Sequence, residues 1–177
     1  MYTALQLIKD QLKSSIDLFE NTAADILIEH IHKDPGGKAF PIGASYAHLV
    51  FSEDMIVQGM LQGKAPLSQT SFKDKTGADS AMPAMDESWD SANQNWSKSV
   101  KIDLPQMREY AKAVHVATTE YVNSLKDEDL EKEIDLGNWG KQKLSQILTG
   151  FIIGHTYSLA GELSALKGIQ GAKGYPF

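Results

Sequence analysis

The feature that most constrains the fold is a long amphipathic stretch near the C-terminus, residues 144–168, with the sequence LSQILTGFIIGHTYSLAGELSALKG. It is long enough for a helix of about seven turns. Two ionisable side chains, His155 and Glu162, fall on its otherwise apolar face, and they need partners because burying unpaired polar groups is costly. Steps of three and four residues define this face, which holds Leu144, Leu148, Phe151, His155, Leu159, Glu162 and Leu166.

Three further stretches repeat apolar residues with the period of a helix, at residues 3–31, 43–60 and 104–125. The first ends at the DPGGK segment, where proline and two glycines break a helix. The third should begin at an N-cap, Asp103, because Pro105 falls in the first turn and Gln106 follows the cap by three residues. The chain therefore contains four long amphipathic helices.

The connections between these helices suggest their order in space. Residues 63–85 show no period, so they form either a crossover between distant helix ends or a lid over a site. A short helix is expected at residues 86–97, with Trp89 and Trp96 on one face. The acidic segment from residue 126 to 141 reads as a solvated linker with a short extended piece. We predict an all-α single domain over residues 1–177, a four-helix bundle in up-down-down-up order.

Composition narrows the classes of function. The formal charge of −6 gives no sign of the basic surface that binding to nucleic acid requires. The absence of cysteine excludes disulfides, thiolate metal sites and a cysteine nucleophile, and it fits a cytoplasmic protein. No signal-peptide pattern opens the chain, and its longest uncharged run is too short to span a bilayer, so we expect no membrane partner.

The candidate site residues are histidines. Counting residues from each helix end places His48, His115 and His155 at similar heights in the predicted bundle, and histidines on facing helices can hold a metal ion. Taken singly, a histidine on such a face is more often structural or at the surface than a metal ligand. Glu162 can serve as a ligand or bond a nearby hydroxyl, and Tyr46 and Tyr157 are candidates for hydrogen bonds to site residues.

The order of these segments resembles the DinB-like superfamily, which includes YfiT-type metal-dependent enzymes, thiol-dependent isomerases and S-transferases. FPIGASYAHLVFSED is similar to the family's second helix with its histidine, and LKDEDLEKEIDLGNWGKQKLSQIL to the segment before its last helix. GHTYSLAGELSALKGIQGAKGYPF is similar to its closing helix, which typically carries H-x-x-x-H-x-G-[EQ]. The resemblance covers nearly the whole chain and implies a bundle that is commonly homodimeric.

The resemblance also implies a divalent metal, often nickel, zinc or iron, held by three histidines. His48 matches the first ligand and His155 the second, but the third position is Leu159, which cannot ligate. Three outcomes follow: the metal site is lost, His115 or Glu162 supplies the third ligand, or two histidines and water hold the ion weakly. Open catalytic zinc sites normally keep three protein ligands.

Two functions of different classes therefore stay open. The first, implied by the resemblance, is a divalent-metal-dependent hydrolase or thiol S-transferase with a reduced metal site at His48 and His155, covered by the loop at 63–85. The second is a non-catalytic bundle that binds a small ligand or acts as a homodimeric, stress-related module. In the second case Leu159 completes the core, and the two histidines bond each other or nearby hydroxyls.

Overall fold

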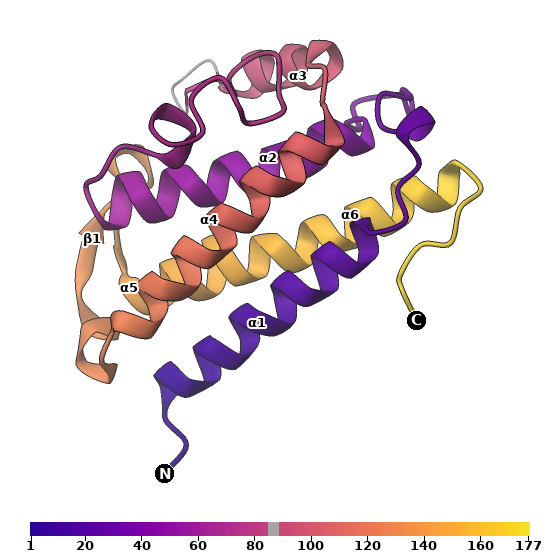
Figure 1. Ribbon diagram of the computed structural model, residues 1–177. Coiled ribbons are helices and arrows are strands. Elements are labelled where there is room, and N and C mark those ends of the chain that lie inside the picture. The colour runs from indigo at the N-terminus through magenta and orange to yellow at the C-terminus, as the bar shows by residue number, and fades with distance from the viewer. Residues whose placement is uncertain (85–88) are drawn as a thin grey trace.

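The structure is a computed structural model that describes residues 1–84 and 89–177, without the side chains of Trp89 and Asn138. It is mostly helical, and four long helical segments lie side by side (Figure 1). The segments are α1 (Ala4–Ala23), α2 (Ile42–Asp54) with a π-helical extension (Met55–Leu61), α4 (Leu104–Ser124), and α5 (Leu144–Gln146) running through a π-helix (Ile147–Gly154) into α6 (His155–Ile169). Of these, α1 and α2 each pack against both α4 and α6.

The first helix is shorter than its sequence period predicts. It ends at Ala23, and residues Ile28–His30 form a separate 3₁₀ turn. Side chains from two other helices bind the carbonyl groups at its end: Arg108 donates to the carbonyls of Ala23 and Ala24 at 2.8 and 3.1 Å, and Lys167 donates to that of Thr22 at 2.7 Å. Since these partners satisfy the terminal carbonyls, the backbone can leave the helix there.

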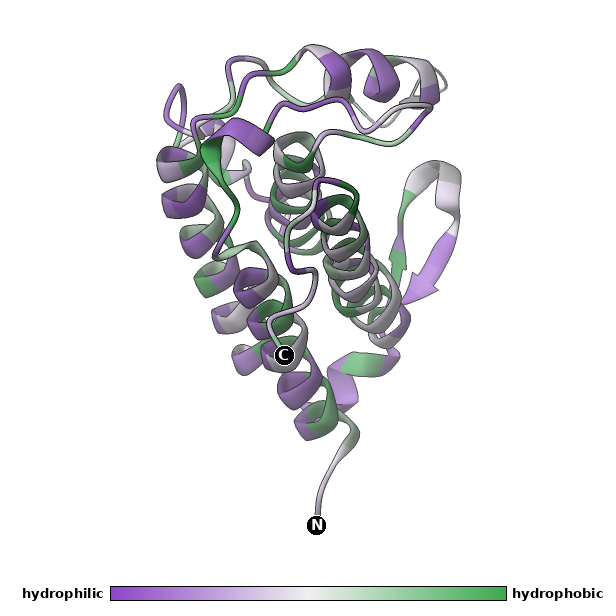
Figure 2. Ribbon diagram, turned by 90° about the vertical axis from the view of Figure 1, so that its right-hand side faces the viewer, coloured by the Kyte–Doolittle hydropathy of each residue, from purple (hydrophilic) through white to green (hydrophobic). Residues whose placement is uncertain are grey.

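Shorter elements lie in the connections between the long segments. The expected short helix is α3 (Trp89–Ser99), while the start predicted for it, residues 86–88, and the face predicted for Trp89 lie outside the described residues. The linker after α4 holds a hairpin that the sequence did not predict as strands, β1 (Glu133–Asp135) and β2 (Lys141–Lys143), in which Ile134 pairs with Gln142. Strands of three residues are too short to show a period of two. The hairpin projects beside the long helices (Figure 2).

The Asp103 N-cap is confirmed, since its carboxylate accepts a hydrogen bond from the backbone N–H of Gln106 at 3.1 Å. The hydrophobic residues of the long helices lie mainly toward neighbouring helices (Figure 2). Leu159 belongs to this core, with 7% of its surface exposed, beside buried residues of α2 and α4. No helix in the described part of the chain is long and apolar enough to cross a membrane.

The long connection after α2 is fastened to the helices by one buried carboxylate. Asp54 accepts hydrogen bonds from the backbone N–H groups of Leu67 and Ser68, both at 2.9 Å, and from the hydroxyl of Tyr110 at 2.6 Å. Phe72 packs against the Tyr110 ring. These contacts place the connection against α2 and α4, on buried core residues.

Replacing Asp54 should therefore loosen this connection. Asp54→Asn keeps the size of the side chain but turns one acceptor into a donor that faces a backbone N–H. We expect a loss of about 3 kcal/mol in the free energy of unfolding, because hydrogen bonds to a buried charge are lost. Urea denaturation measures it. Tyr110→Phe, which removes one of the three partners, should cost about 1 kcal/mol, and equal losses in the two variants would contradict the assigned role.

Candidate functional site

His48 and His155 face one pocket. His48 lies in α2 and His155 is the first residue of α6, and their ring centroids are 5.2 Å apart with the ring planes at 89°. Both side chains are half-buried. The pocket has a volume of about 510 Å³, within the range of small-molecule sites. Its lining consists of His48, Ser52, Ile56, Trp139, Gly150, Phe151, Gly154, His155 and Ser158.

Both π-helical segments border this pocket. Ile56 comes from Met55–Leu61, and Gly150, Phe151 and Gly154 come from Ile147–Gly154. π-Helical turns are rare and often occur at functional sites. A Cβ atom at Gly150 would meet nothing within 4 Å, so the absence of a side chain there leaves open space in the pocket wall.

The hairpin supplies the aromatic wall of the pocket. Trp139, between β1 and β2, stacks on Phe151 with ring centroids 5.3 Å apart and an interplanar angle of 21°. Trp139 was predicted only as part of a linker, and the signal that could have identified it is a large aromatic residue between glycines in an otherwise polar segment. Among the described residues, none from the connection at 63–84 lines the pocket, although the hydroxyl of the lining residue Ser52 lies 4.0 Å from the sulfur of Met82. The lid over the two histidines stays a prediction.

Burial keeps both imidazoles uncharged near neutral pH. It lowers the pKa of His48 to about 4, and the neighbouring His155 lowers it further in the same direction. Burial also lowers the pKa of His155, against a smaller opposite effect from the negative charge of Glu53. Neutral imidazoles can donate and accept hydrogen bonds, and they are also the form that binds metal ions.

The residues present do not fit a metal held by three protein ligands. Leu159, at the third position, packs in the core and does not line the pocket. Glu162 is exposed and accepts a hydrogen bond from the hydroxyl of Ser45 at 2.5 Å, away from the pocket lining. Within the part of the chain that the structure describes, no group of three His, Cys, Asp or Glu side chains could hold a metal ion.

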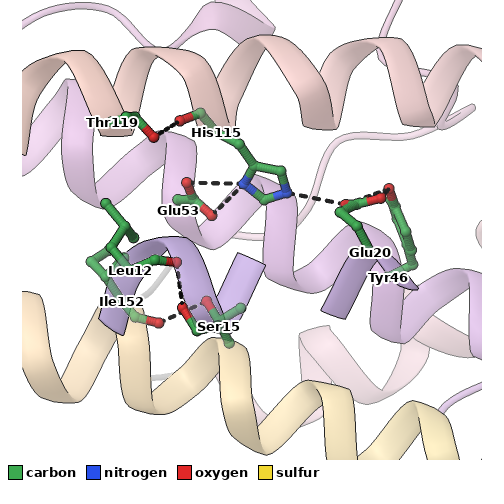
Figure 3. A network of polar contacts seen from close by, with 9 residues as sticks. Leu12, Ser15, Glu20, Tyr46, Glu53, His115, Thr119 and Ile152 are labelled. Carbon is green, nitrogen blue, oxygen red and sulfur yellow. Dashed lines mark hydrogen bonds and ion pairs between the residues drawn. The ribbon is translucent and has the colours of Figure 1, made fainter. Parts of the chain in front are cut away.

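The third predicted histidine, His115, belongs to a different polar cluster. Its Nδ1 lies 3.0 and 3.2 Å from the two carboxylate oxygens of Glu53, and its Nε2 lies 3.1 Å from Oε1 of Glu20 (Figure 3). The hydroxyl of Tyr46 donates to the same Glu20 carboxylate at 2.8 and 3.0 Å. Both contacts of the ring require a donor, so the geometry fits an imidazolium that carries a proton on each nitrogen.

In this cluster the positive charge of His115 and the negative charge of Glu53 stabilise each other. Burial would lower the pKa of His115, but the charge of Glu53 and the hydrogen bonds to Glu20 and Glu53 raise it to about 10. Burial would raise the pKa of Glu53, but the charge and hydrogen bond of His115 lower it on balance. Neither carboxylate was predicted as a site residue, although Glu53 closely follows the apolar residues 49–51 in the sequence, where a charge needs a partner.

Tyr157 also lies outside the pocket, and its hydroxyl donates to Gln11 at 3.2 Å. Thus, of the six side chains proposed from the sequence, the structure brings only His48 and His155 together in the pocket. Tyr46 and His115 meet at Glu20 instead.

Comparison with known proteins identifies the relatives of the chain. The model of the DinB superfamily matches residues 9–158. A crystal structure of a conserved protein from Enterococcus faecalis shares the fold, with a TM-score of 0.75 and 18% sequence identity over 94% of this chain and 96% of that one. No curated protein matches the sequence.

The His115 cluster predicts a loss of stability at alkaline pH. Because the folded-state pKa of His115 is about 10 and its ordinary value is 6.5, its contribution is complete below pH 6.5 and disappears as pH rises through 10. We expect the free energy of unfolding from urea denaturation to fall between pH 7 and pH 10. His115→Gln should lower stability by about 3–5 kcal/mol at pH 7 and remove most of that fall.

His30→Gln provides the control, because His30 lies outside the cluster. Its pH profile should parallel that of the unmodified chain. Parallel profiles for His115→Gln and the unmodified chain would contradict a charged His115 in the folded protein.

Proposed function

The chain belongs to the DinB superfamily, and we propose that it binds a small, uncharged, largely aromatic molecule in the pocket of His48 and His155. The observation that carries this proposal is the composition of the pocket, where two imidazoles and an aromatic wall stand together while the third ligand position of the family is a core leucine. The function is ligand binding, without a metal-dependent reaction.

The chemistry of the lining supports this ligand class. Trp139, Phe151 and Ile56 offer apolar and aromatic contact area, and the stacked Trp139 and Phe151 rings present a flat wall. His48, His155 and the Ser52 hydroxyl offer hydrogen bonds to a polar group on the ligand. A mostly apolar cavity with a few convergent polar groups is the usual form of a small-molecule site. No charged side chain lines the pocket among the residues described, which favours an uncharged ligand.

Weak binding of a divalent ion is the second candidate, and the pairing of two neutral imidazoles in one pocket favours it. His48 and His155 would hold nickel, zinc or iron with water in the remaining positions. Such binding is the precondition for the hydrolase or S-transferase activity that the family resemblance implies, and the two experiments below separate it from the first proposal.

We also interpret the four long segments as an up-down-down-up bundle. Three contacts support the relative directions of α1, α4 and α6 in this order. Lys167 near the end of α6 reaches Thr22 near the end of α1, whereas the end of α1 meets Arg108 near the start of α4. The backbone N–H of Leu5 near the start of α1 donates to Asp127, just after α4, at 3.1 Å.

A substitution that fills the pocket should block ligand binding. At Gly150 a new side chain would meet open space, so Gly150→Leu should occupy the cavity with little strain. We expect 1-naphthol, an uncharged aromatic probe with one hydroxyl, to bind the unmodified chain and to bind Gly150→Leu at least about tenfold more weakly. Isothermal titration calorimetry measures the affinity.

Gly168→Leu is the matched control, because Gly168 is also helical, has open space at its Cβ position and does not line the pocket. It should bind 1-naphthol as the unmodified chain does. Equal affinity of all three proteins for 1-naphthol would contradict the proposal, and so would the absence of 1-naphthol binding to the unmodified chain.

Restoring the third histidine should create a metal site. Leu159→His places an imidazole four residues after His155, on the same side of α6. Without metal it should lower stability by about 2 kcal/mol, since a polar group enters the core, and added zinc or nickel should raise its melting temperature. Leu159→Gln controls for polarity and should not respond to the ions.

The unmodified chain tests the second candidate directly. Stoichiometric metal in protein purified without a histidine tag, lost in His48→Ala and His155→Ala, would support metal binding over the proposed ligand binding. Metal-free protein whose melting temperature is unmoved by added ions would exclude it.

A further inference from the structure

A second and larger cavity lies between α1 and α4. It is a groove of about 950 Å³, and the described residues that line it all come from residues 6–20 of α1 and residues 108–123 of α4. Among the residues that the structure describes, it shares none of its lining with the pocket of His48 and His155. Its volume falls within the range of small-molecule sites.

The floor of this groove carries net negative charge. Glu20 and His115 both line it, and Glu53 contacts the His115 ring on the side opposite to Glu20 (Figure 3). One imidazolium between two carboxylates leaves one negative charge in excess. The Glu53 side chain is 2% exposed, but that of Glu20 is 35% exposed, so the excess charge is accessible from the groove at Glu20.

The Glu20 carboxylate has room for another donor. An ionised carboxylate offers about four acceptor positions. His115 occupies one on Oε1, and the Tyr46 hydroxyl contacts both oxygens. Within the described chain no Lys or Arg side chain lies within ion-pair distance of Glu20. A ligand that donates a hydrogen bond, and above all one that carries positive charge, would complete the coordination of this carboxylate.

The walls of the groove add an apolar surface. Leu12, Ile16 and Val122 line it, and Val116 is 50% exposed although it is a large apolar side chain. Two of the four cations on the lining have partners: Arg108 binds the carbonyls at the end of α1, and Lys13 pairs with Asp17. The other two, Lys9 and Lys112, are balanced by Asp10, Glu109 and Glu120 on the same lining.

We propose that the groove between α1 and α4 binds an amphiphilic primary amine, with its ammonium group on the Glu20 carboxylate and its apolar body against Ile16 and Val116. The ammonium supplies a further hydrogen-bond donor to Glu20, and its positive charge offsets the one negative charge that His115 leaves unbalanced in the cluster. The hydrocarbon covers apolar surface that is otherwise in contact with water.

Isothermal titration of the full-length chain at pH 7.5 tests this assignment with three probes of equal chain length. n-Octylammonium should bind at least about tenfold more tightly than n-octanol or octanoate. Glu20→Gln should weaken n-octylammonium binding by about tenfold or more, because a charge-assisted hydrogen bond is lost. Glu109→Gln removes a neighbouring carboxylate of the same groove and should leave the affinity within a factor of two.

Val116→Trp provides a second test that keeps the carboxylate. It fills the groove from a half-exposed position, so n-octylammonium binding should be lost while the fold, monitored by circular dichroism, is retained. His48→Ala should leave the affinity for n-octylammonium unchanged. If that variant no longer binds 1-naphthol, the result concerns only the pocket of His48 and His155 and does not contradict the amine site. Equal affinities for n-octylammonium and n-octanol, tighter binding of octanoate, or no effect of Glu20→Gln in a folded variant would each overturn the proposal.

Discussion

The charged contact between His115 and Glu53 is the interaction on which the arrangement of the helices depends. It joins α4 to α2, and Glu20 extends it to α1. A buried carboxylate without its imidazolium would cost several kcal/mol, because each ion must leave water. The three groups therefore fix the rotation of three helices about their axes, since their short, polar contacts tolerate less displacement than apolar packing does.

That fixed rotation also places the pocket. Glu53 directly follows Ser52, and successive helical residues point about 100° apart, so a helix that turns Glu53 toward α4 turns Ser52 and His48 toward a different neighbour. On α2 the polar cluster and the pocket thus share one short segment. The negative charge of Glu53 also acts on His155, where it opposes part of the effect of burial. Glu53 consequently affects the pKa of one pocket histidine, although Glu53 does not itself line the pocket.

Much of the helical content was predictable from the sequence, because the positions of the long helices follow from the spacing of apolar residues and from the Asp103 cap. The juxtaposition of His48 and His155 was also expected, through the family resemblance. The end of α1 at Ala23 was not, since it depends on Arg108 and Lys167 from distant helices. His115 was expected near the other two histidines, but it contacts Glu53 and Glu20 instead. Counting residues gives the height of a side chain along a helix but not the direction in which it points.

The position of Trp139 has a consequence for how such a pocket can diversify. The stacked tryptophan stands on a hairpin outside the packed helices, whereas the histidines stand on helices that the core holds in place. Changes at the tip of the hairpin can therefore alter the shape of this wall, and with it the ligands that the proposed site would take, at little cost to folding. The aromatic wall at Trp139 and the packing of the long helices therefore depend on separate parts of the chain, and drift in the hairpin tip need not compromise the helices.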